Sequence, residues 1–272
     1  MSEKKDPIIR LVGLWKSFNG ESVLRGLNLD VYRGQTTVVI GPSGCGKTVL
    51  LRHIVGLLKP DRGKVFFDGI DITHLSEREL VPIRRRIGFL FQSNALFDSM
   101  TVAENIYFPM MEQGIESEQE LRRRCQEVLK LVGMEGMEHK MPEELSGGQK
   151  KRVALARAIA LNPEVILYDE PTTGLDPVRA DLINTLIIKL QKELKTTTLV
   201  VTHDMDSARK VADRIVMLYN GQILVDTTPE GLSKITNDVV IRFIDGQATP
   251  EELDEVRLGK SLQEKENDRK GT

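Results

Sequence analysis

The sequence contains little cysteine and no long hydrophobic run. Its two cysteines, Cys45 and Cys125, lack the spacing of a zinc site or a disulfide framework, which fits a reducing, cytosolic compartment. Residues 1–7 lack the apolar stretch of a secretory signal. No stretch approaches the ~18 consecutive apolar residues that a membrane-spanning helix needs. Any role at a membrane is therefore expected to be peripheral.

An excess of charge of one sign is also absent. The sequence has 38 Lys and Arg residues against 40 Asp and Glu residues, which gives a net charge of −2. Because a general nucleic-acid binder is basic, and no basic block or RNA-binding signature occurs here, we expect no nucleic-acid partner. With 272 residues the chain is long enough for one large α/β domain or two small ones.

A phosphate-binding loop is the most specific feature that is present. An apolar strand at residues 36–40 leads into a G-x-x-x-x-G-K-[ST] pattern, and a helix is expected to begin at Val49. The glycines let the backbone turn its N–H groups toward phosphate oxygens, and the helix N-terminus adds further N–H groups and a positive dipole end. We expect Lys47 to reach the β- and γ-phosphates and Thr48 to ligate Mg²⁺. The nucleotide-binding residues predicted in this loop are Gly41, Pro42, Ser43, Gly44, Cys45, Gly46, Lys47 and Thr48.

Cys45 has two interpretations within this loop. A helix N-terminus lowers the pKa of a nearby thiol, which would make Cys45 sensitive to oxidation. Alternatively, Cys45 is a small residue that the loop tolerates.

Two adjacent carboxylates follow a second apolar strand, at residues 165–168. Asp169 and Glu170 are costly at the end of a buried strand unless they bind a cation or polarise water. Beside a phosphate loop, we expect Asp169 to hold the water shell of Mg²⁺ and Glu170 to act as the base toward the attacking water. The alternative is that both are solvated loop residues.

Three further residues stand where elements end. Gln92 follows a strand at residues 87–91 and either faces a ligand crevice or is a plain loop residue. His203 follows a strand at residues 197–202 and is either structural or a contact to the γ-phosphate. Phe18 precedes an Asn-Gly turn and either stacks on an adenine base or packs within the hairpin.

A second helix start carries glycines. Ser146 and Gln149 form a capping box around Gly147 and Gly148, at the beginning of a helix expected through Ile159. The exposed N–H groups make this a second anion-binding helix end.

The region between residues 93 and 146 has helical rather than strand periodicity, and it is rich in methionine. Flexible, polarisable side chains suit a surface that grips a partner, although they also fill gaps in a small helical core. The residues of this cluster are Met100, Met110, Met111, Met134, Met137 and Met141, together with Leu96, Phe97 and Phe108.

These motifs occur in the order found in ATP-binding cassette (ABC) ATPases, and the resemblance spans residues 8–245. It implies an α/β fold of the P-loop NTPase type with an antiparallel β subdomain and a helical subdomain that carries the signature sequence at residues 145–149. The domain boundaries predicted on this basis are a flexible N-terminus at 1–7, an ATPase domain at 8–246 with its helical subdomain at about 95–160, and a charged, flexible tail at 247–272.

The resemblance also implies site roles. Phe18 stacks on adenine, Gln92 touches Mg²⁺ and senses a membrane subunit, and His203 contacts the γ-phosphate. In head-to-tail homodimers of this family, a signature helix faces ATP on the partner's phosphate loop. The residues that the resemblance assigns to the dimer are Ser146, Gly147, Gly148, Gln149 and, in the dimer loop, Asp176.

One position departs from the family pattern. Val49 follows Thr48 where a second hydroxyl residue is usual. We expect loss of a hydroxyl contact to the α-phosphate and a modest weakening of nucleotide binding.

Three segments, at residues 91–102, 150–155 and 242–246, resemble the ATPases of Mla-type, Mce-associated lipid transporters. This implies ATP-driven phospholipid transport between the inner and outer membranes. The implied partners are two transmembrane permease subunits, an Mce-domain lipid-binding protein and a small accessory subunit, at the cytoplasmic face of a bacterial inner membrane. The alternatives are an importer of amino acids or other small solutes, and a soluble ABC ATPase with no role in transport.

Overall fold

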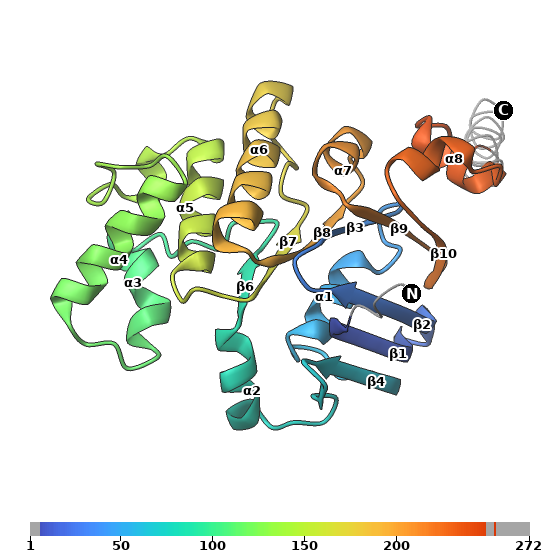
Figure 1. The fold of residues 1–272 in the computed structure, drawn as a ribbon, viewed down its shortest axis with the longest axis horizontal. Coiled ribbons are helices and arrows are strands. Elements are labelled where there is room, and N and C mark those ends of the chain that lie inside the picture. The colour runs from blue at the N-terminus through green and yellow to red at the C-terminus, as the bar shows by residue number, and fades with distance from the viewer. Residues whose placement is uncertain (1–5, 249–252, 254–272) are drawn as a thin grey trace, which may run out of the picture. The chain divides into compact units, whose positions relative to one another are not determined.

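The computed structural model describes residues 6–248 and 253. The chain divides into two compact units, Met1–Pro229 and Glu230–Thr272, which are described separately. The first unit contains two β-sheets and most of the helices (Figure 1). The predicted N-terminus at 1–7 and tail at 247–272 lie for most of their length outside the described residues.

The smaller sheet is antiparallel and has the strand order β2-β1-β4-β5. The hairpin of β1 and β2 turns at Asn19 and Gly20, whose φ angles of 50° and 86° match the Asn-Gly turn predicted from the sequence. This sheet confirms the antiparallel β region. Its strands are β1 (Pro7–Phe18), β2 (Glu21–Tyr32), β4 (Arg62–Phe67) and β5 (Ile70–Asp71).

The larger sheet has six strands in the order β10-β9-β3-β8-β7-β6. Neighbouring strands are parallel except β10, which pairs antiparallel with β9. Its strands are β3 (Thr36–Ile40), β6 (Ile87–Leu90), β7 (Val165–Asp169), β8 (Thr197–Thr202), β9 (Arg214–Tyr219) and β10 (Gln222–Thr227).

The register of this sheet brings the predicted motifs to one edge. Ile40 at the end of β3 pairs with Thr202 at the end of β8, and Asp169 at the end of β7 pairs with Val201. Leu90, the last residue of β6, pairs with Tyr168. The segments that follow these four strands therefore emerge side by side, where ligands bind in open parallel sheets.

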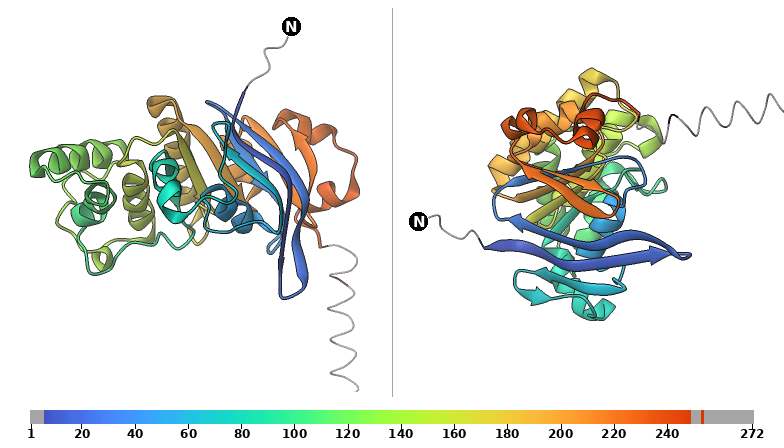
Figure 2. Two further views of the ribbon diagram at one scale, coloured as in Figure 1. Left: turned by 90° about the horizontal axis from the view of Figure 1, so that it is seen from below. Right: turned by 90° about the vertical axis from the view of Figure 1, so that its right-hand side faces the viewer.

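Helices cover both faces of the larger sheet. Helix α1 lies between the two sheets, while α6 and α7 lie on the opposite face of the larger one (Figures 1 and 2). Helices α3, α4 and α5 pack together beyond β6. The helices of the first unit are α1 (Lys47–Ile54), α2 (Glu77–Arg85), α3 (Val102–Met111), α4 (Glu118–Leu131), η1 (Pro142–Glu144), α5 (Gly147–Ile159), α6 (Pro177–Leu194) and α7 (Met205–Val211). In the second unit, the described residues form η2 (Glu230–Lys234) and α8 (Asp238–Ile244).

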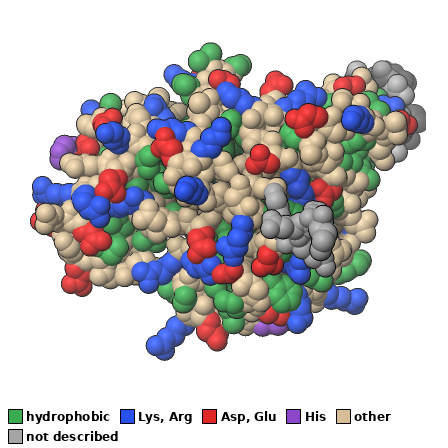
Figure 3. Space-filling model, in the orientation of Figure 1, with side chains coloured by type: hydrophobic (Ala, Val, Ile, Leu, Met, Phe, Trp, Pro, Cys, Tyr) green, Lys and Arg blue, Asp and Glu red, His purple; other side chains and the backbone are tan. Residues whose placement is uncertain are grey.

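One hydrophobic core joins the two sheets through α1. Apolar residues of the smaller sheet, such as Leu11 and Phe67, cluster with Leu50 and Ile54 of α1 and with strand residues of the larger sheet such as Val201. The phosphate loop is thus anchored at both ends, by β3 and by a helix that is buried in this core. On the face shown in Figure 3, basic and acidic side chains are intermingled, in keeping with the near-zero net charge.

Several helices differ from the prediction or were not predicted, and α1 begins at Lys47 rather than at Val49. Helix α6 begins at Pro177, because the Asp176 side chain caps it by accepting a hydrogen bond from the Arg179 N–H at 3.0 Å and proline suits the first helical position. Helix α7 was not predicted. It has only seven residues, and Asp204 caps it directly after β8.

Candidate nucleotide-binding site

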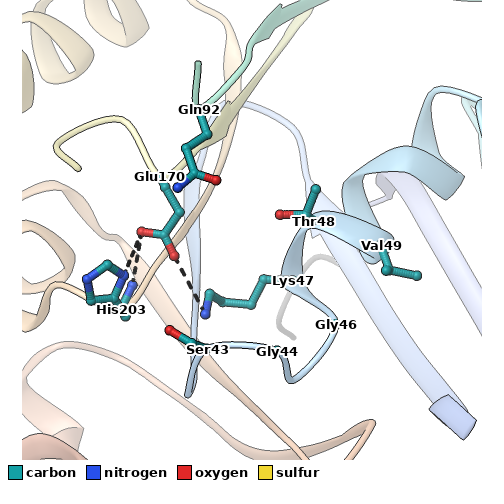
Figure 4. Close-up of a pocket in the computed structure, with 9 residues that line it drawn as sticks. All are labelled: Ser43, Gly44, Gly46, Lys47, Thr48, Val49, Gln92, Glu170 and His203. Carbon is teal, nitrogen blue, oxygen red and sulfur yellow. Dashed lines mark hydrogen bonds and ion pairs between the residues drawn. The ribbon is translucent and has the colours of Figure 1, made fainter. Parts of the chain in front are cut away.

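A pocket of about 340 Å³ opens at the carboxyl edge of the larger sheet. Figure 4 shows the side chains of Lys47, Glu170 and His203 meeting at its centre, with Thr48 beside Lys47 on α1 and Gln92 reaching toward Glu170 from the segment after β6. The lining residues are Ser43, Gly44, Gly46, Lys47, Thr48, Val49, Gln92, Glu170 and His203. The loop residues, Gln92, Glu170 and His203 were each predicted from the sequence, and the structure brings them together.

The phosphate loop adopts a backbone that requires glycine. Gly44 and Gly46 have φ angles of 80° and 107°, in the left-handed region where a Cβ is disfavoured. Gly46 immediately precedes α1, so the loop and the unpaired N–H groups of the helix start face the pocket together.

The Lys47 side chain is buried at the base of this loop. Its Nζ donates to the Gly41 carbonyl at 2.7 Å and the Pro42 carbonyl at 3.0 Å, and it lies 3.6 Å from Glu170 Oε1. The ammonium is therefore held next to the loop that would carry a phosphate, with one carboxylate already near it.

Thr48 and Asp169 form an oxygen pair beside Lys47. Thr48 Oγ1 donates to Asp169 Oδ1 at 2.9 Å, and Asp169 is buried. Burial raises the pKa of Asp169, the hydrogen bond from Thr48 opposes that rise, and the negative charge of Glu170 adds to it. Hydroxyl, carboxylate and amide oxygens are the ligands that Mg²⁺ prefers, so Thr48, Asp169 and Gln92 fit a magnesium site.

Glu170 is positioned by backbone and side-chain contacts together. Its φ of 50° lies in the left-handed region, and its N–H donates to the Val201 carbonyl at 2.9 Å. Its Oε2 lies 2.9 Å from His203 Nδ1 and accepts from the His203 N–H at 3.3 Å. A non-glycine residue in this conformation costs roughly 1–3 kcal/mol, and such residues cluster at functional sites.

The structure bears on the interpretation of two residues at the phosphate loop, Val49 and Cys45. The Val49 side chain packs against the hydrophobic core and points away from Glu170 (Figure 4). Cys45 is half-buried, and burial raises the pKa of its thiol despite the nearby charge of Lys47. The structure therefore favours Cys45 as a small residue over the oxidation-sensitive thiol, because a raised pKa reduces the thiolate fraction.

Phe18 lies outside this pocket. It ends β1 at the hairpin turn, it is 40% exposed, and Lys16 Nζ lies 5.5 Å from its ring centroid. Its ring is not buried in the hairpin, so one aromatic face remains accessible at the outer end of the smaller sheet.

The signature residues also lie outside the pocket. Ser146 caps α5: its Oγ accepts from the Gln149 N–H at 3.4 Å, and Gln149 Oε1 accepts from the Ser146 N–H at 2.9 Å, as the capping box predicts. Ser146 and Gly147 are exposed and Gly148 is buried. Asp176, assigned to a dimer loop, is the cap of α6 described above.

An apolar groove of about 450 Å³ lies between β6 and the α3–α5 bundle. We call it the groove; it includes four aromatic side chains and a basic rim, among them Phe89, Phe91, Phe97, Phe108, Arg85 and Arg157. Phe97 and Phe108 of the methionine-rich cluster line the groove, whereas Leu96 and Met100 are not among its lining residues. The methionine cluster is mixed: Met110 and Met134 are buried, Met111 is 59% exposed, and none of the six lines the groove.

Sequence reasoning missed Lys151. This lysine of α5 is buried, and its Nζ donates to the Gln92 carbonyl at 3.2 Å. A lone lysine on a helix gives no sequence signal for such a contact.

A site that only binds an anion does not need a carboxylate. Here, however, the buried Asp169 accepts a hydrogen bond from the Thr48 hydroxyl, a group that can ligate a metal ion. Glu170 lies between Lys47 and His203 beside the phosphate loop. This arrangement defines a P-loop nucleoside triphosphatase. None of the helices in the described part of the chain is long and apolar enough to cross a membrane.

Comparison with known proteins shows the family to which this nucleoside triphosphatase belongs. Residues 24–173 match the ABC transporter family, and the chain belongs to it as an ATPase. The "Probable ribonucleotide transport ATP-binding protein mkl" of Mycobacterium leprae is 42% identical over 88% of this chain and 69% of the relative. The "Intermembrane phospholipid transport system ATP-binding protein MlaF" of Haemophilus influenzae is 42% identical over 82% of this chain and 84% of the relative.

A solved structure agrees with the fold. The dimeric post-hydrolysis state of the ATP-binding cassette MJ0796, bound to ADP and Pi, superposes with a TM-score of 0.75 at 38% identity. It covers 81% of this chain and 98% of that structure.

Proposed function

We propose that this chain is the ATP-hydrolysing subunit of an ABC transporter that moves phospholipid between the inner and outer membranes of a bacterium. The observation that carries the proposal is the extent of the match to the Haemophilus protein named for phospholipid transport, which includes 84% of that protein at 42% identity. The match to the mycobacterial relative includes 69% of its length. The three segments that resemble Mla-type ATPases support the same choice.

ATP binding follows from the loop and its flanking elements. The backbone N–H groups of residues 41–48 and the start of α1 take the phosphates, and the Lys47 ammonium takes the charge of the β- and γ-phosphoryl groups. Phe18, with one exposed face, stacks on the adenine base. Val49 lacks a hydroxyl that could contact the α-phosphate, which weakens ATP binding without abolishing it.

Hydrolysis depends on Glu170. Its carboxylate, held by His203 and Lys47, accepts a proton from a water molecule aligned with the γ-phosphate. Because His203 Nδ1 is bound to Glu170, Nε2 is the ring nitrogen that contacts the γ-phosphate. Thr48, Asp169 and Gln92 would hold Mg²⁺, which when bound neutralises charge that develops on the phosphoryl oxygens.

The signature helix acts on a partner subunit's nucleotide. Ser146 and Gly147 are exposed at the start of α5 and outside the pocket of their own chain. The Ser146 N–H is bound by Gln149 Oε1, so the Gly147 N–H and the positive end of the helix are what α5 offers to a second anion. A head-to-tail homodimer, with Asp176 at its interface, sandwiches each ATP between a phosphate loop and an α5 N-terminus. Because the contact is symmetric, two identical sites form.

The groove docks a permease subunit. Phe97 is 41% exposed and Phe91 is 36% exposed, which leaves an apolar surface open on one side of the ATPase. Two permease subunits, one for each ATPase, convert dimer closure and reopening into alternating conformations of the membrane part. The same assembly would include an Mce-domain protein and a small accessory subunit, with the ATPase peripheral to the cytoplasmic face of the inner membrane.

The test is purification of the wild-type chain from its native membrane in mild detergent, with mass spectrometry of the proteins and lipids that accompany it. A permease, an Mce-domain protein and bound phospholipid are the expected result. A solute-binding protein and a small-solute permease would instead favour the importer alternative. Recovery in the soluble fraction alone would contradict both transport functions and favour a soluble ABC ATPase.

A groove variant shows whether the partner docks where we propose. Phe97→Asp places a charge in the apolar groove, so the permease should no longer accompany the protein. Ile70→Asp is the matched control, because Ile70 is similarly exposed, at 48%, but lies on β5 outside the groove. Equal recovery of the permease with both variants would exclude the groove as its docking site.

A further inference from the structure

Helix α5 holds the segment that follows β6 through two cations. Lys151 Nζ donates to the Gln92 carbonyl at 3.2 Å. One turn and a half further along the helix, the Arg157 guanidinium donates to the Ala95 carbonyl at 2.6 Å and the Asn94 carbonyl at 2.9 Å. Three carbonyls of a four-residue stretch are thus bound by one helix.

The stretch that these cations hold is strained. Asn94 and Ala95 have φ angles of 65° and 51°, so two consecutive residues without glycine lie in the left-handed region. Asparagine visits this region fairly readily, whereas alanine seldom does. Such a backbone persists only where its surroundings impose it, and Arg157 donates to both of these carbonyls.

Lys151 is an unusual donor for this purpose. It is 3% exposed, and among the residues that the structure describes its one hydrogen-bond partner is the neutral carbonyl of Gln92. Because Lys151 is buried with this one hydrogen bond, its donor is committed to holding the Gln92 carbonyl in place.

Helix α5 also connects the places where the other partners act. Its first turn carries Ser146 and Gly147, and Arg157 lines the groove with its guanidinium 5.9 Å from the Phe97 ring centroid. Gln92 lies between these two ends and lines the nucleotide pocket.

We propose that Lys151 is the positioning residue for Gln92, and that Lys151 and Arg157 together make α5 the rigid link between the nucleotide pocket, the signature end and the groove. Lys151 fixes the Gln92 carbonyl and so aims its side chain at the metal. A displacement of α5, from either end, moves Gln92 with it. This inference rests on the proposed roles of Gln92 and of the signature residues.

The test replaces Lys151 by methionine, whose unbranched side chain is one atom shorter and lacks the donor. Lys150→Met is the matched control on the adjacent, half-buried position. Steady-state ATP hydrolysis, binding of a fluorescent ATP analogue, and hydrogen–deuterium exchange of the peptide at residues 91–100 are measured on the full chain.

For Lys151→Met we expect kcat to fall about 10- to 100-fold, since a small misplacement of a positioning group has effects of that size. KM and analogue affinity should stay within about twofold of the control, because the phosphate loop is intact. Exchange should rise in peptide 91–100 and not in α1. Lys151→Gln, which retains an N–H donor, should recover much of the protection and the rate.

Equal kcat and equal exchange in Lys151→Met and Lys150→Met would overturn the proposal. Should Lys151→Met fail to fold, Lys151→Leu decides the matter, because it also lacks the donor and should give a rate below that of Lys150→Leu and faster exchange in the same peptide. Equality of those two variants would also overturn it. Wild-type ATP hydrolysis, measured in parallel, tests the proposed function separately: a wild type that hydrolyses ATP with insensitive Lys151 variants contradicts only this inference.

Discussion

Glu170 Oε2 lies 2.9 Å from His203 Nδ1 and also accepts the His203 backbone N–H at 3.3 Å. The two residues follow adjacent parallel strands, β7 and β8, so the sheet register sets their separation. A carboxylate bound at one oxygen in this way keeps one orientation, which is what a base needs in order to face a fixed water molecule.

Removal of this contact should slow hydrolysis. We expect His203→Ala to lower kcat about 100-fold, because both the orientation of Glu170 and a donor toward the phosphate are lost. ATP affinity should change far less, since Lys47 and the loop remain. His74→Ala, a histidine exposed outside the site, is the control for steady-state assays. A His203→Ala enzyme with the control's kcat would show that the contact has no catalytic role.

The signature helix should act only in the dimer. Ser146→Arg places a bulky cation where the partner's γ-phosphate docks, so ATPase activity should fall about 100-fold while the isolated subunit still binds ATP. Ser117→Arg is a matched control, because Ser117 also caps a helix by accepting from an N–H three residues on, at 3.4 Å. Both changes remove a cap, so a difference in activity isolates the dimer contact. Similar activity in the two variants would contradict the sandwich arrangement.

A hydroxyl at position 49 should strengthen nucleotide binding. Val49→Thr is nearly isosteric and adds one hydrogen-bonding group at the edge of the pocket. We expect the Kd for ATP to fall about 2- to 10-fold, the equivalent of one hydrogen bond of roughly 0.5–1.5 kcal/mol. Isothermal titration calorimetry measures this directly. An unchanged or weaker affinity would mean that the valine does not replace a phosphate contact.

An ion-pair network should give the fold a pH-dependent contribution. Arg86 lies 2.5 Å from both Asp68 and Glu164 and lowers the pKa of each, mainly through its hydrogen bonds. Because both pKa values are lower in the folded chain, the stabilisation is present above the ordinary carboxylate pKa and is lost as the pH falls through the lowered values.

Arg86→Met should therefore destabilise the protein at pH 7 by about 1 kcal/mol, a figure kept small because solvent screens these partly exposed groups. The difference from wild type should shrink near pH 3. Chemical denaturation at several pH values measures both effects. Arg122→Met, which removes an exposed i,i+4 pair with Glu118, should cost little at any pH. A difference for Arg86→Met that is independent of pH would assign its effect to packing on Phe67 instead.

The sequence predicted the residues of the pocket well, because each follows the end of a strand. Lys47, Gln92, Glu170 and His203 could be placed at one edge as soon as the strands were taken as parallel neighbours. The capping box at Ser146 was likewise predicted, since it depends on local spacing alone.

Other features depend on tertiary packing and gave no local signal. The burial of Lys151 requires α5 to lie against the segment after β6, and the groove requires Phe89, Phe97 and Phe108 from separate elements. Composition likewise left the methionine cluster open between a partner surface and a helical core, and the structure buries Met110 and Met134 while Met111 is exposed. The left-handed backbone of Glu170 is similarly imposed by its bond to Val201 rather than by its residue type.

We propose above that ATP bound at this pocket joins two chains, and that Glu170 then hydrolyses the ATP. The most direct measurement is size-exclusion chromatography with light scattering on Glu170→Gln, with ATP and Mg²⁺, beside an assay of phosphate release. We predict a stable dimer that retains ATP and releases no phosphate, with a monomer when ATP is omitted. A Glu170→Gln protein that stays monomeric with ATP, or that hydrolyses ATP at the wild-type rate, would contradict the account.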